Sequence, residues 1–481
     1  MGKVRTAVLW SFVTQYGQMI CTFVTSVILA RLLTPAEIGV FSIAMIIVGF
    51  GRLLRDFGIS DYIVQEADLT DQKIRTAQTL NFATGWAVGI TLFLFAGQIG
   101  EFYGEPAAAE VIRLLSINFL FVPVGAITFA RLRRDLRFKE TTQIQIGAII
   151  LTSVVSITMA YAGYGANSMA YGAIAGAITT AIACQFFRYA NGFGFSLGDL
   201  RSVWGYSSNS IAFSSLRYFT QSLPELLLGR WGGMHDVGIY SKGRSTVRLA
   251  YQSVVGGIKP VMMPAFAKDR AQAGKLQQGY LDALSASIVF VWPAVAYSAL
   301  MAEEIVLFLF GSQWLESAAV MRVAAVGTLA WSAATFSEDL LKGTGKIKLL
   351  YRVELFLFPI VGVISYVCAP GGAVVLAAGL AGFAILRFVV ATILMMALYN
   401  FSLPAIALVL LRGFRCAALP AIAAYAFAIQ IPGLSPLFKL LATAVAFSST
   451  WIAVMIIWKD ANFMRMVSLV KAMGKRPASN G

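Results

Sequence analysis

Arginine side chains recur inside long apolar stretches of this 481-residue sequence. A guanidinium group stays charged when it leaves water, and its fork of N–H donors matches the oxygens of a phosphate. A charged residue within a membrane span is rare and usually marks a functional path. The arginines therefore predict a cavity for an anionic ligand. The residues predicted to line this cavity are Gln18, Arg52, Arg55, Arg217, Gln221, Arg244 and Arg248.

Polar residues at i+3 and i+4 steps fall on one face of a helix, and two such stripes support the prediction. The first stripe consists of Ser11, Gln15, Gln18, Thr22 and Ser26. The second occupies the matching positions of a later span and consists of Ser210, Ser214, Arg217, Gln221 and Glu225. Acidic residues of the charged stretches are candidates for coupling transport to an ion: Asp56, Glu225, Glu338 and Asp339.

Several of these residues also have a purely structural interpretation. Arg52 and Asp56 are spaced i,i+4 and could form a self-neutralising ion pair, with Arg55 as an anchor at the inner surface. Arg217 could be the buried partner of Glu225, two turns away. The Ser and Thr residues of the stripes could serve helix packing alone.

Other features favour structure over function. Arg352, Glu354 and Arg387 are interpreted as anchors near the cytoplasmic ends of their spans. The Gly85/Gly89 and Gly172/Gly176 spacings indicate close helix packing.

The elements that must position these residues are membrane helices. Hydrophobic residues make up 58% of the chain and charged residues 13%, and the mean hydropathy is +0.75. A soluble domain carries about 25% charged residues. The apolar blocks are about 20 residues long, which is the length of a membrane-spanning helix. The predicted fold class is an all-α polytopic membrane protein with about fourteen transmembrane helices and no room for a soluble catalytic domain.

The basic residues cluster in alternate connections between these blocks. Residues 131–139 and 268–275 are basic, whereas residues 99–110 and 301–316 contain no Lys or Arg. The positive-inside rule then places both termini in the cytoplasm and makes the number of spans even. The formal net charge of +15 thus reflects topology, and no nucleic-acid partner is expected.

Residues for enzyme or metal chemistry are scarce. The four cysteines, Cys21, Cys184, Cys368 and Cys416, are far apart and lack metal-ligand spacing. His235 is the only histidine, and no complete phosphate-binding Gly-rich loop is present. We therefore expect neither an enzyme nor a bound metal or cofactor.

An internal repeat organises the chain. The residues Glu37-Ile-Gly39-Val-Phe-Ser42 return about 200 residues later as Asp236-Val-Gly238-Ile-Tyr-Ser241. Because each unit would hold an even number of spans, the repeat predicts two parallel six-helix lobes around a central cavity, plus two extra helices. The predicted lobes are residues 1–200 and 201–400. Residues 401–481 would contain an interfacial connector near 400–413, helices thirteen and fourteen, and a basic cytoplasmic tail.

The run from Leu29 to Ser42, followed by Phe57 to Gln65 and Asp68-Leu-Thr70, resembles one known family. It is similar to the Wzx-type flippases, the polysaccharide branch of the multidrug/oligosaccharidyl-lipid/polysaccharide flippase superfamily. The resemblance implies alternating access without ATP, in a bacterial inner membrane. It implies transport of undecaprenyl-pyrophosphate-linked oligosaccharides for exopolysaccharide, capsule or O-antigen synthesis. It further implies membrane lipid, H⁺ or Na⁺ as coupling ion, and the polymerase and chain-length machinery as partners.

Three alternatives differ in class. A multidrug exporter of the same superfamily would share the fold, but a cationic cavity should repel its lipophilic cations. A membrane polysaccharide polymerase or ligase would need a large outer loop, which the short connections do not provide. A scaffold subunit would leave the charged stripes unexplained.

Overall fold

The computed structural model describes residues 2–56, 58–66, 68–186, 196, 198, 200–270 and 272–458. For residues 2–9, 61, 200–214, 260–261 and 273 of these it describes the backbone alone. Throughout these ranges the secondary structure is helical, without strands. The predicted basic tail after residue 458 lies outside them.

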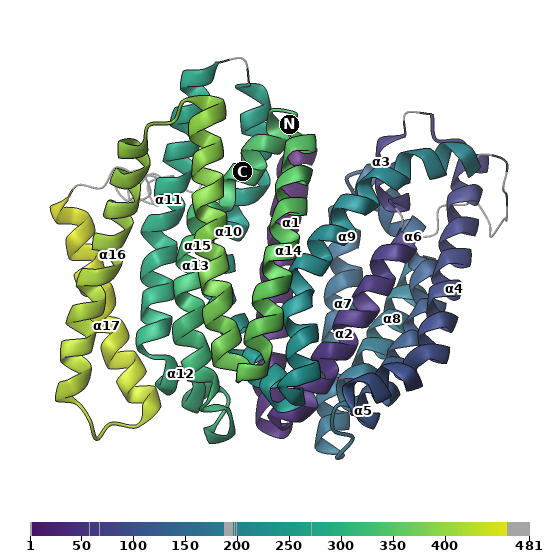
Figure 1. Ribbon diagram of the computed structural model, residues 1–481. Coiled ribbons are helices and arrows are strands. Elements are labelled where there is room, and N and C mark those ends of the chain that lie inside the picture. The colour runs from purple at the N-terminus through teal and green to yellow at the C-terminus, as the bar shows by residue number, and fades with distance from the viewer. Residues whose placement is uncertain are drawn as a thin grey trace, which may run out of the picture. The chain divides into compact units, whose positions relative to one another are not determined.

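The helices follow one another through short connections (Figure 1). In chain order they are α1 (Gly2–Leu32), α2 (Pro35–Asp56), α3 (Ile59–Gln65), α4 (Asp71–Tyr103), α5 (Pro106–Ser116), α6 (Asn118–Arg134), α7 (Phe138–Tyr161), α8 (Asn167–Phe186), α9 (Leu200–Trp231), α10 (Gly233–Lys268), α11 (Ala273–Leu300), α12 (Ala302–Leu309), η1 (Ser312–Trp314), α13 (Ser317–Gly343), α14 (Ile347–Cys368), η2 (Ala369–Gly371), α15 (Gly372–Tyr399), α16 (Leu403–Gln430) and α17 (Pro436–Ile457).

The number of long helices agrees with the prediction. If α5 and α6 count as one span and the short α3 and α12 are left aside, 14 helices remain within the described residues. By length and composition, 11 segments of this part of the chain could cross a membrane. The charged helices α9 and α10 are not among these segments. The all-helical membrane fold is therefore confirmed.

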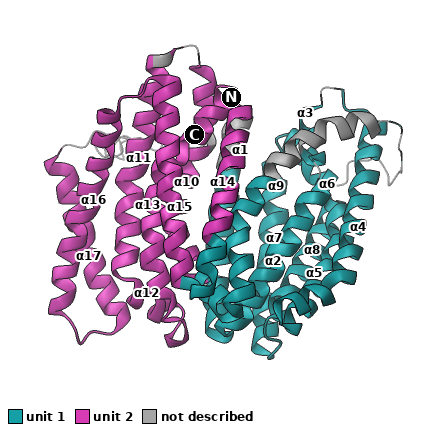
Figure 2. Ribbon diagram, in the orientation of Figure 1, with its two compact units in different colours: residues 1–241, 365–373 teal, residues 242–364, 374–481 magenta. Residues whose placement is uncertain are grey.

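The chain divides into two compact units (Figure 2). Unit 1 consists of residues 1–241 and 365–373, and unit 2 of residues 242–364 and 374–481. Within unit 1, α7 packs on α1 and α8, and α2 packs on α4, α5 and α9. Within unit 2, α11 packs on α13 and α16, and α17 packs on α12 and α16. The lobe boundaries near residues 200 and 400 stay predictions.

Small residues allow the helices of unit 1 to approach closely. A Cβ atom added at Gly172 of α8 would lie 1.9 Å from the Ser156 hydroxyl of α7. One added at Gly89 of α4 would lie 2.9 Å from Cβ of Phe119 on α6. The glycine spacings are thus packing sites, as predicted.

A capping box begins α2. The Thr34 backbone N–H donates to Glu37 Oε2 at 2.7 Å, and the Glu37 N–H donates to Thr34 Oγ1 at 3.3 Å. These two bonds satisfy orphan donors at the helix start, and Pro35 fills the first helical position, where no N–H is needed. The sequence Thr34-Pro-Ala-Glu37 is therefore a helix-start signal.

The two copies of the repeated motif meet each other within unit 1. A Cβ atom at Gly39 would lie 1.8 Å from the carbonyl oxygen of Met234, and one at Gly238 would lie 1.9 Å from that of Pro35. Both contacts use backbone oxygens, so the start of α2 and the start of α10 cross at van der Waals distance.

The serines at the end of the motif repeat this reciprocity. The hydroxyl oxygens of Ser42 and Ser241 are 3.4 Å apart, and the residues are 199 positions apart in the chain. Equivalent residues thus contact each other, which is the signature of a two-fold axis. The described residues therefore contain a local two-fold contact, defined as Gly39 and Ser42 of α2 against Gly238 and Ser241 of α10.

The short helix α3 is tied to α6 and to the start of α4. Nη1 of Arg134 donates to the carbonyl oxygens of Ile63 and Glu66 at 2.7 and 2.6 Å. Lys73 Nζ donates to Glu66 Oε1 at 2.7 Å, and this bond holds the pKa of the Glu66 carboxyl below its ordinary value. The helix α3 is thereby held to α6 and to the start of α4.

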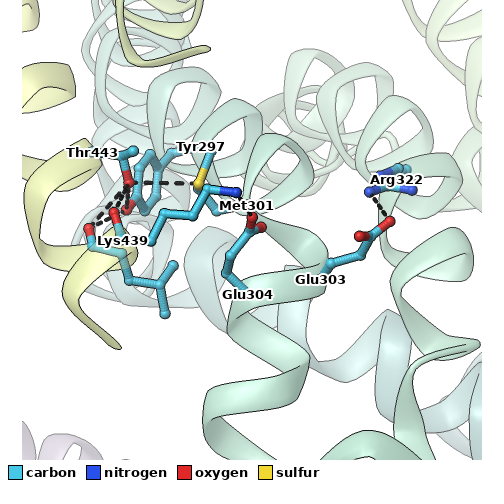
Figure 3. A network of polar contacts seen from close by, with 8 residues as sticks. Tyr297, Met301, Glu303, Glu304, Arg322, Lys439 and Thr443 are labelled. Atoms are coloured by element: carbon cyan, nitrogen blue, oxygen red, sulfur yellow. Dashed lines mark hydrogen bonds and ion pairs between the residues drawn. The ribbon is translucent and has the colours of Figure 1, made fainter. Parts of the chain in front are cut away.

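Polar contacts dock α17 in unit 2 (Figure 3). Lys439 Nζ of α17 donates to Glu304 Oε1 of α12 at 2.6 Å, and the Tyr297 and Thr443 hydroxyls are 3.1 Å apart. Segment 400–413, expected as a separate interfacial connector, instead leads into α16, which continues unbroken to Gln430.

Candidate functional site

The predicted site residues fall into both units. Unit 1 holds the predicted residues of α1, α2 and α9, and unit 2 those of α10 and α13. The first group is Gln18, Arg52, Arg55, Asp56, Arg217, Gln221 and Glu225, and the second is Arg244, Arg248, Glu338 and Asp339.

An ion pair closes the end of α2. Nε of Arg55 donates to Asp56 Oδ1 at 3.0 Å, and Nη2 of Arg55 contacts the same oxygen. The Arg55 side chain is only 8% exposed. Both structural alternatives for this segment are therefore wrong: Asp56 pairs with Arg55 and not with Arg52, and Arg55 is no surface anchor. Because Asp56 is the last residue of α2, its side chain does not have to follow the i,i+4 rule.

Arg52 differs from its neighbour. Its side chain is half-buried, and it makes no hydrogen bond or ion pair within the described part of the chain. Arg55, Asp56 and the Tyr218 hydroxyl of α9 lie within electrostatic reach of it. Since the Arg55–Asp56 pair neutralises itself, this end of α2 carries a net positive charge.

Tyr218 links α9 to α2. Its hydroxyl donates to the carbonyl oxygen of Ile46 at 2.6 Å, and a Cβ atom at Gly49 would lie 2.1 Å from that hydroxyl. Glu225, two turns further along α9, lies within electrostatic reach of Tyr218. Arg217, Gln221 and Glu225 are half-buried on the same helix.

Gln18 contributes to the contact between α1 and α7. Its side-chain Nε2 donates to Gln145 Oε1 at 3.4 Å, and Thr25 Oγ1 donates to Ser153 Oγ at 2.7 Å. Part of the first polar stripe therefore serves helix packing. Gln15 and Thr22 of the same stripe are exposed. Ser210 and Ser214 of the second stripe lie among the residues described by backbone alone.

In unit 2 the charged residues of α10 and α13 gather around Tyr251. Its hydroxyl lies 2.9 Å from Thr335 Oγ1, and Arg248, Glu338 and Asp339 are within electrostatic reach. Arg248 is exposed, whereas Glu338 and Asp339 are buried. Arg248 thus faces the surface, while the two acids lie inside the unit.

One of those acids has a basic partner on its own helix. Lys342 Nζ donates to Glu338 Oε1 at 2.7 Å, an i,i+4 pair in α13. Arg244 is half-buried one turn before Arg248. The proposed role of the acids in ion coupling stays a prediction.

A buried ion pair joins α14 and α15. Nη1 of Arg387 donates to Glu354 Oε2 at 3.3 Å, Nη2 contacts Oε1, and the Glu354 side chain is 1% exposed. The Arg387 guanidinium also lies 4.7 Å from the centroid of the Trp331 ring. A carboxylate buried to this extent needs a cationic partner, and Arg387 provides it. The interpretation of Arg387 and Glu354 as interfacial anchors is therefore wrong.

Tyr218 and Tyr251 were missed by sequence reasoning. Each lies close in sequence to a predicted arginine, Arg217 or Arg248, on one of the charged helices α9 and α10. A buried tyrosine hydroxyl usually finds a hydrogen-bond partner, so this adjacency is the signal that could have found them. Among the described residues, no group of three or more His, Cys, Asp or Glu side chains could hold a metal ion.

The fold defines a multi-pass, all-α membrane protein. Similar folds are known from solved structures. The chain aligns with the lipid II flippase MurJ in its inward closed conformation with a TM-score of 0.79 and 12% identity, covering 94% of this chain and 99% of that one. An inward-facing multidrug resistance transporter of the MATE family aligns with a TM-score of 0.60 and 14% identity, covering 80% and 96%.

The family is shown by sequence. Residues 28–319 match the family described as "Polysaccharide biosynthesis protein". The succinoglycan biosynthesis transport protein ExoT of Rhizobium meliloti is 24% identical, over 71% of this chain and 69% of its own. The lipopolysaccharide biosynthesis protein WzxC of Escherichia coli is 24% identical, over 74% and 73%. The chain belongs to this family of Wzx-like polysaccharide flippases; it is a transporter of repeat units and not an enzyme.

Proposed function

We propose that this protein moves undecaprenyl-pyrophosphate-linked oligosaccharide units from the inner to the outer leaflet of a bacterial inner membrane. The product would be an exopolysaccharide, a capsule or an O-antigen. The proposal is carried by one observation: this member of the family has arginines on two of its long helices, Arg217 on α9 and Arg244 and Arg248 on α10. Two relatives, named for succinoglycan transport and lipopolysaccharide biosynthesis, support the glycan class.

The chemistry of the substrate fits this charge. A pyrophosphate is the anionic end of a lipid-linked sugar, and guanidinium groups bind its oxygens through charge-assisted hydrogen bonds. Arg217 and Gln221 on α9, and Arg244 and Arg248 on α10, are the proposed contacts. Two parallel lobes would alternate around such a path without ATP. Asp56, Glu225, Glu338 and Asp339 are the proposed acids for coupling to H⁺ or Na⁺.

Deletion of the gene tests the function. The deleted strain is expected to accumulate lipid-linked repeat units in the cytoplasmic leaflet and to lose surface polysaccharide. Arg217→Ala and Arg248→Ala should restore export poorly, because each loses a bond worth roughly 1.5–3 kcal/mol, or about 10- to 150-fold in rate. Arg217→Lys should restore export in part, because a point charge replaces a fork.

A matched arginine controls for stability. Arg322 forms an ion pair with Glu303 (Figure 3). The paired atoms are 2.6 Å apart and both side chains are about half exposed, so Arg322→Ala should export normally. Membrane levels of all variants must be equal. If both Arg217→Ala and Arg248→Ala export at the unmutated rate, the cationic path is wrong. If deletion causes no accumulation, the flippase function itself fails.

We also propose that both ends of the chain are cytoplasmic, because the basic connections alternate. An enzyme reporter that is active only outside the cytoplasm is expected to be silent at Gly481 and active when inserted at Glu105. The connection at Glu105 joins α4 to α5 and contains no Lys or Arg. Activity at Gly481 together with silence at Glu105 would show that the proposed orientation is wrong.

A further inference from the structure

Unit 1 contains a cavity of about 400 Å³ between α2, α4 and α9. Its walls are apolar, with Phe50 and Leu54 on α2, Val88 and Leu92 on α4, and Leu226 on α9. The volume lies within the range of ligand pockets, which are also lined mainly by hydrophobic side chains. The cavity is therefore large enough for part of a hydrophobic ligand.

The Tyr218 and Thr91 hydroxyl groups in the wall already donate to backbone carbonyl oxygens. Tyr218 donates to the carbonyl oxygen of Ile46 at 2.6 Å, and Thr91 donates to that of Ala87 at 2.8 Å. A sugar placed here would lose its hydrogen bonds to water without replacement, whereas a hydrocarbon chain loses nothing. The lining thus selects a hydrocarbon ligand.

A positive charge lies next to this apolar wall. Arg52 directly follows the lining residue Gly51, and the lining residue Tyr218 is within its electrostatic reach. As described above, Arg52 is the arginine of α2 without an ion pair, and the neighbouring Arg55–Asp56 pair is neutral overall. The ligand that complements both features has an apolar chain and an anionic end.

The direction of the pocket fits a lipid of the inner leaflet. On α2 the lining runs from Ile46 to Leu54, about 12 Å at 1.5 Å per residue. Arg52 lies one turn before the end of α2, which the predicted topology places at the cytoplasmic side. A lipid phosphate at the level of Arg52 would send its chain along this wall toward the middle of the bilayer. The exposed side chains of Leu54, Ala87 and Thr91 leave the pocket accessible from outside the unit.

We propose that this pocket holds the polyprenyl chain of the transported lipid-linked glycan, with Arg52 binding the phosphate end of that chain. The assignment rests on the proposed function, because that function supplies a polyprenyl phosphate in the inner leaflet. An ordinary phospholipid is the competing occupant, and the experiment separates the two.

Photolabelling of the purified full-length protein tests the pocket. The protein is reconstituted into phosphatidylcholine vesicles that contain a trace of a polyprenyl phosphate with a diazirine in its chain. After illumination, peptide mass spectrometry is expected to find the label on the pocket residues of α2, α4 and α9. Ala87→Phe fills the pocket and should lower this labelling by about tenfold or more. Arg52→Gln should lower it to a similar extent, and Arg52→Lys by less, because lysine keeps the charge.

Ala83→Phe is the matched control. Ala83 is also exposed on α4, one turn before Ala87, but it does not line the pocket. Labelling of Ala83→Phe should equal that of the unmutated protein, and size-exclusion profiles verify that all variants are folded. Equal labelling in Ala87→Phe and Ala83→Phe would overturn the proposal, as would label found only on other helices.

Competition identifies the occupant. Excess unlabelled polyprenyl phosphate should remove the label, whereas the same excess of phosphatidylglycerol should not. If phosphatidylglycerol competes equally well, the pocket is a general lipid site and the assignment is wrong. The proposed function is judged separately, by the accumulation of lipid-linked units in the deletion strain, so a protein that exports glycans but shows no pocket labelling refutes this inference alone.

Discussion

Replacement of Gly39 by valine is expected to remove the folded protein from the membrane. A Cβ atom at this position would lie 1.8 Å from the Met234 carbonyl oxygen, and a backbone atom cannot rotate away as a side chain can. Overpacking of a tight contact costs about 1–3 kcal/mol, and a branched residue against backbone should exceed that range. The measurement is the yield of monodisperse protein in size-exclusion chromatography after membrane extraction.

Alanine variants give a graded comparison. Gly39→Ala and Gly238→Ala should both lower the thermal inactivation midpoint, and by similar amounts, because their contacts are reciprocal. Gly147→Ala on α7 is the control, since nothing lies within 4 Å of a Cβ atom there. The stability of that variant should be unchanged or higher by up to about 1 kcal/mol, because alanine is favoured over glycine by about that amount inside a helix. If Gly39→Ala and Gly147→Ala have the same midpoint, α2 and α10 do not cross as closely as described.

Removal of the Arg387 charge is expected to have the second-largest effect. Arg387→Met leaves Glu354, with a side chain 1% exposed, as an unpaired buried carboxylate. Breaking such a pair from one side costs about 3–5 kcal/mol. The thermal inactivation midpoint of the purified protein should fall accordingly, and the guanidinium contact with Trp331 is lost as well.

Replacement of both partners should reverse most of this loss. The double variant Glu354→Leu/Arg387→Met leaves no buried charge, and apolar replacements of buried pairs are often neutral. Arg322→Met breaks the exposed pair with Glu303 and should change stability by no more than about 1 kcal/mol. Equal shifts for Arg387→Met and Arg322→Met would show that burial of Glu354 contributes nothing.

The helices and the repeat could be predicted from sequence because both depend on local patterns. An apolar block of about 20 residues is readable in one dimension, and so is a motif that returns with the same spacing. The glycines at which α8 packs on α7, and α4 on α6, could also be predicted, because they recur at regular spacings. The short α3 and α12 were not, because a helix of one or two turns leaves no periodic signal.

Partner choice among the charges could not be read in the same way. The i,i+4 rule favours Arg52 for Asp56, but the rule holds inside a helix, and Asp56 is the end of one. Glu354 and Arg387 lie on different helices, 33 residues apart, so only the packing of α14 against α15 reveals the pair. Tyr218 and Tyr251 carry no charge. That Tyr218 of α9 lies near Arg52 of α2, and that Tyr251 of α10 bonds to α13, depends on which faces of these helices pack together.

The local two-fold contact explains why the repeat is still readable where it is. Gly39 and Gly238 each face a backbone oxygen of the other copy, so neither can acquire a side chain while the other helix keeps its course. Pro35 and Met234 supply only those oxygens, and their side chains have been free to become different. At the 199-residue offset, Gly39 and Gly238, which touch across the axis, are identical, whereas Pro35 and Met234, which contribute main chain alone, differ. Within unit 1 the two copies of the motif therefore constrain each other through their backbones at this crossing.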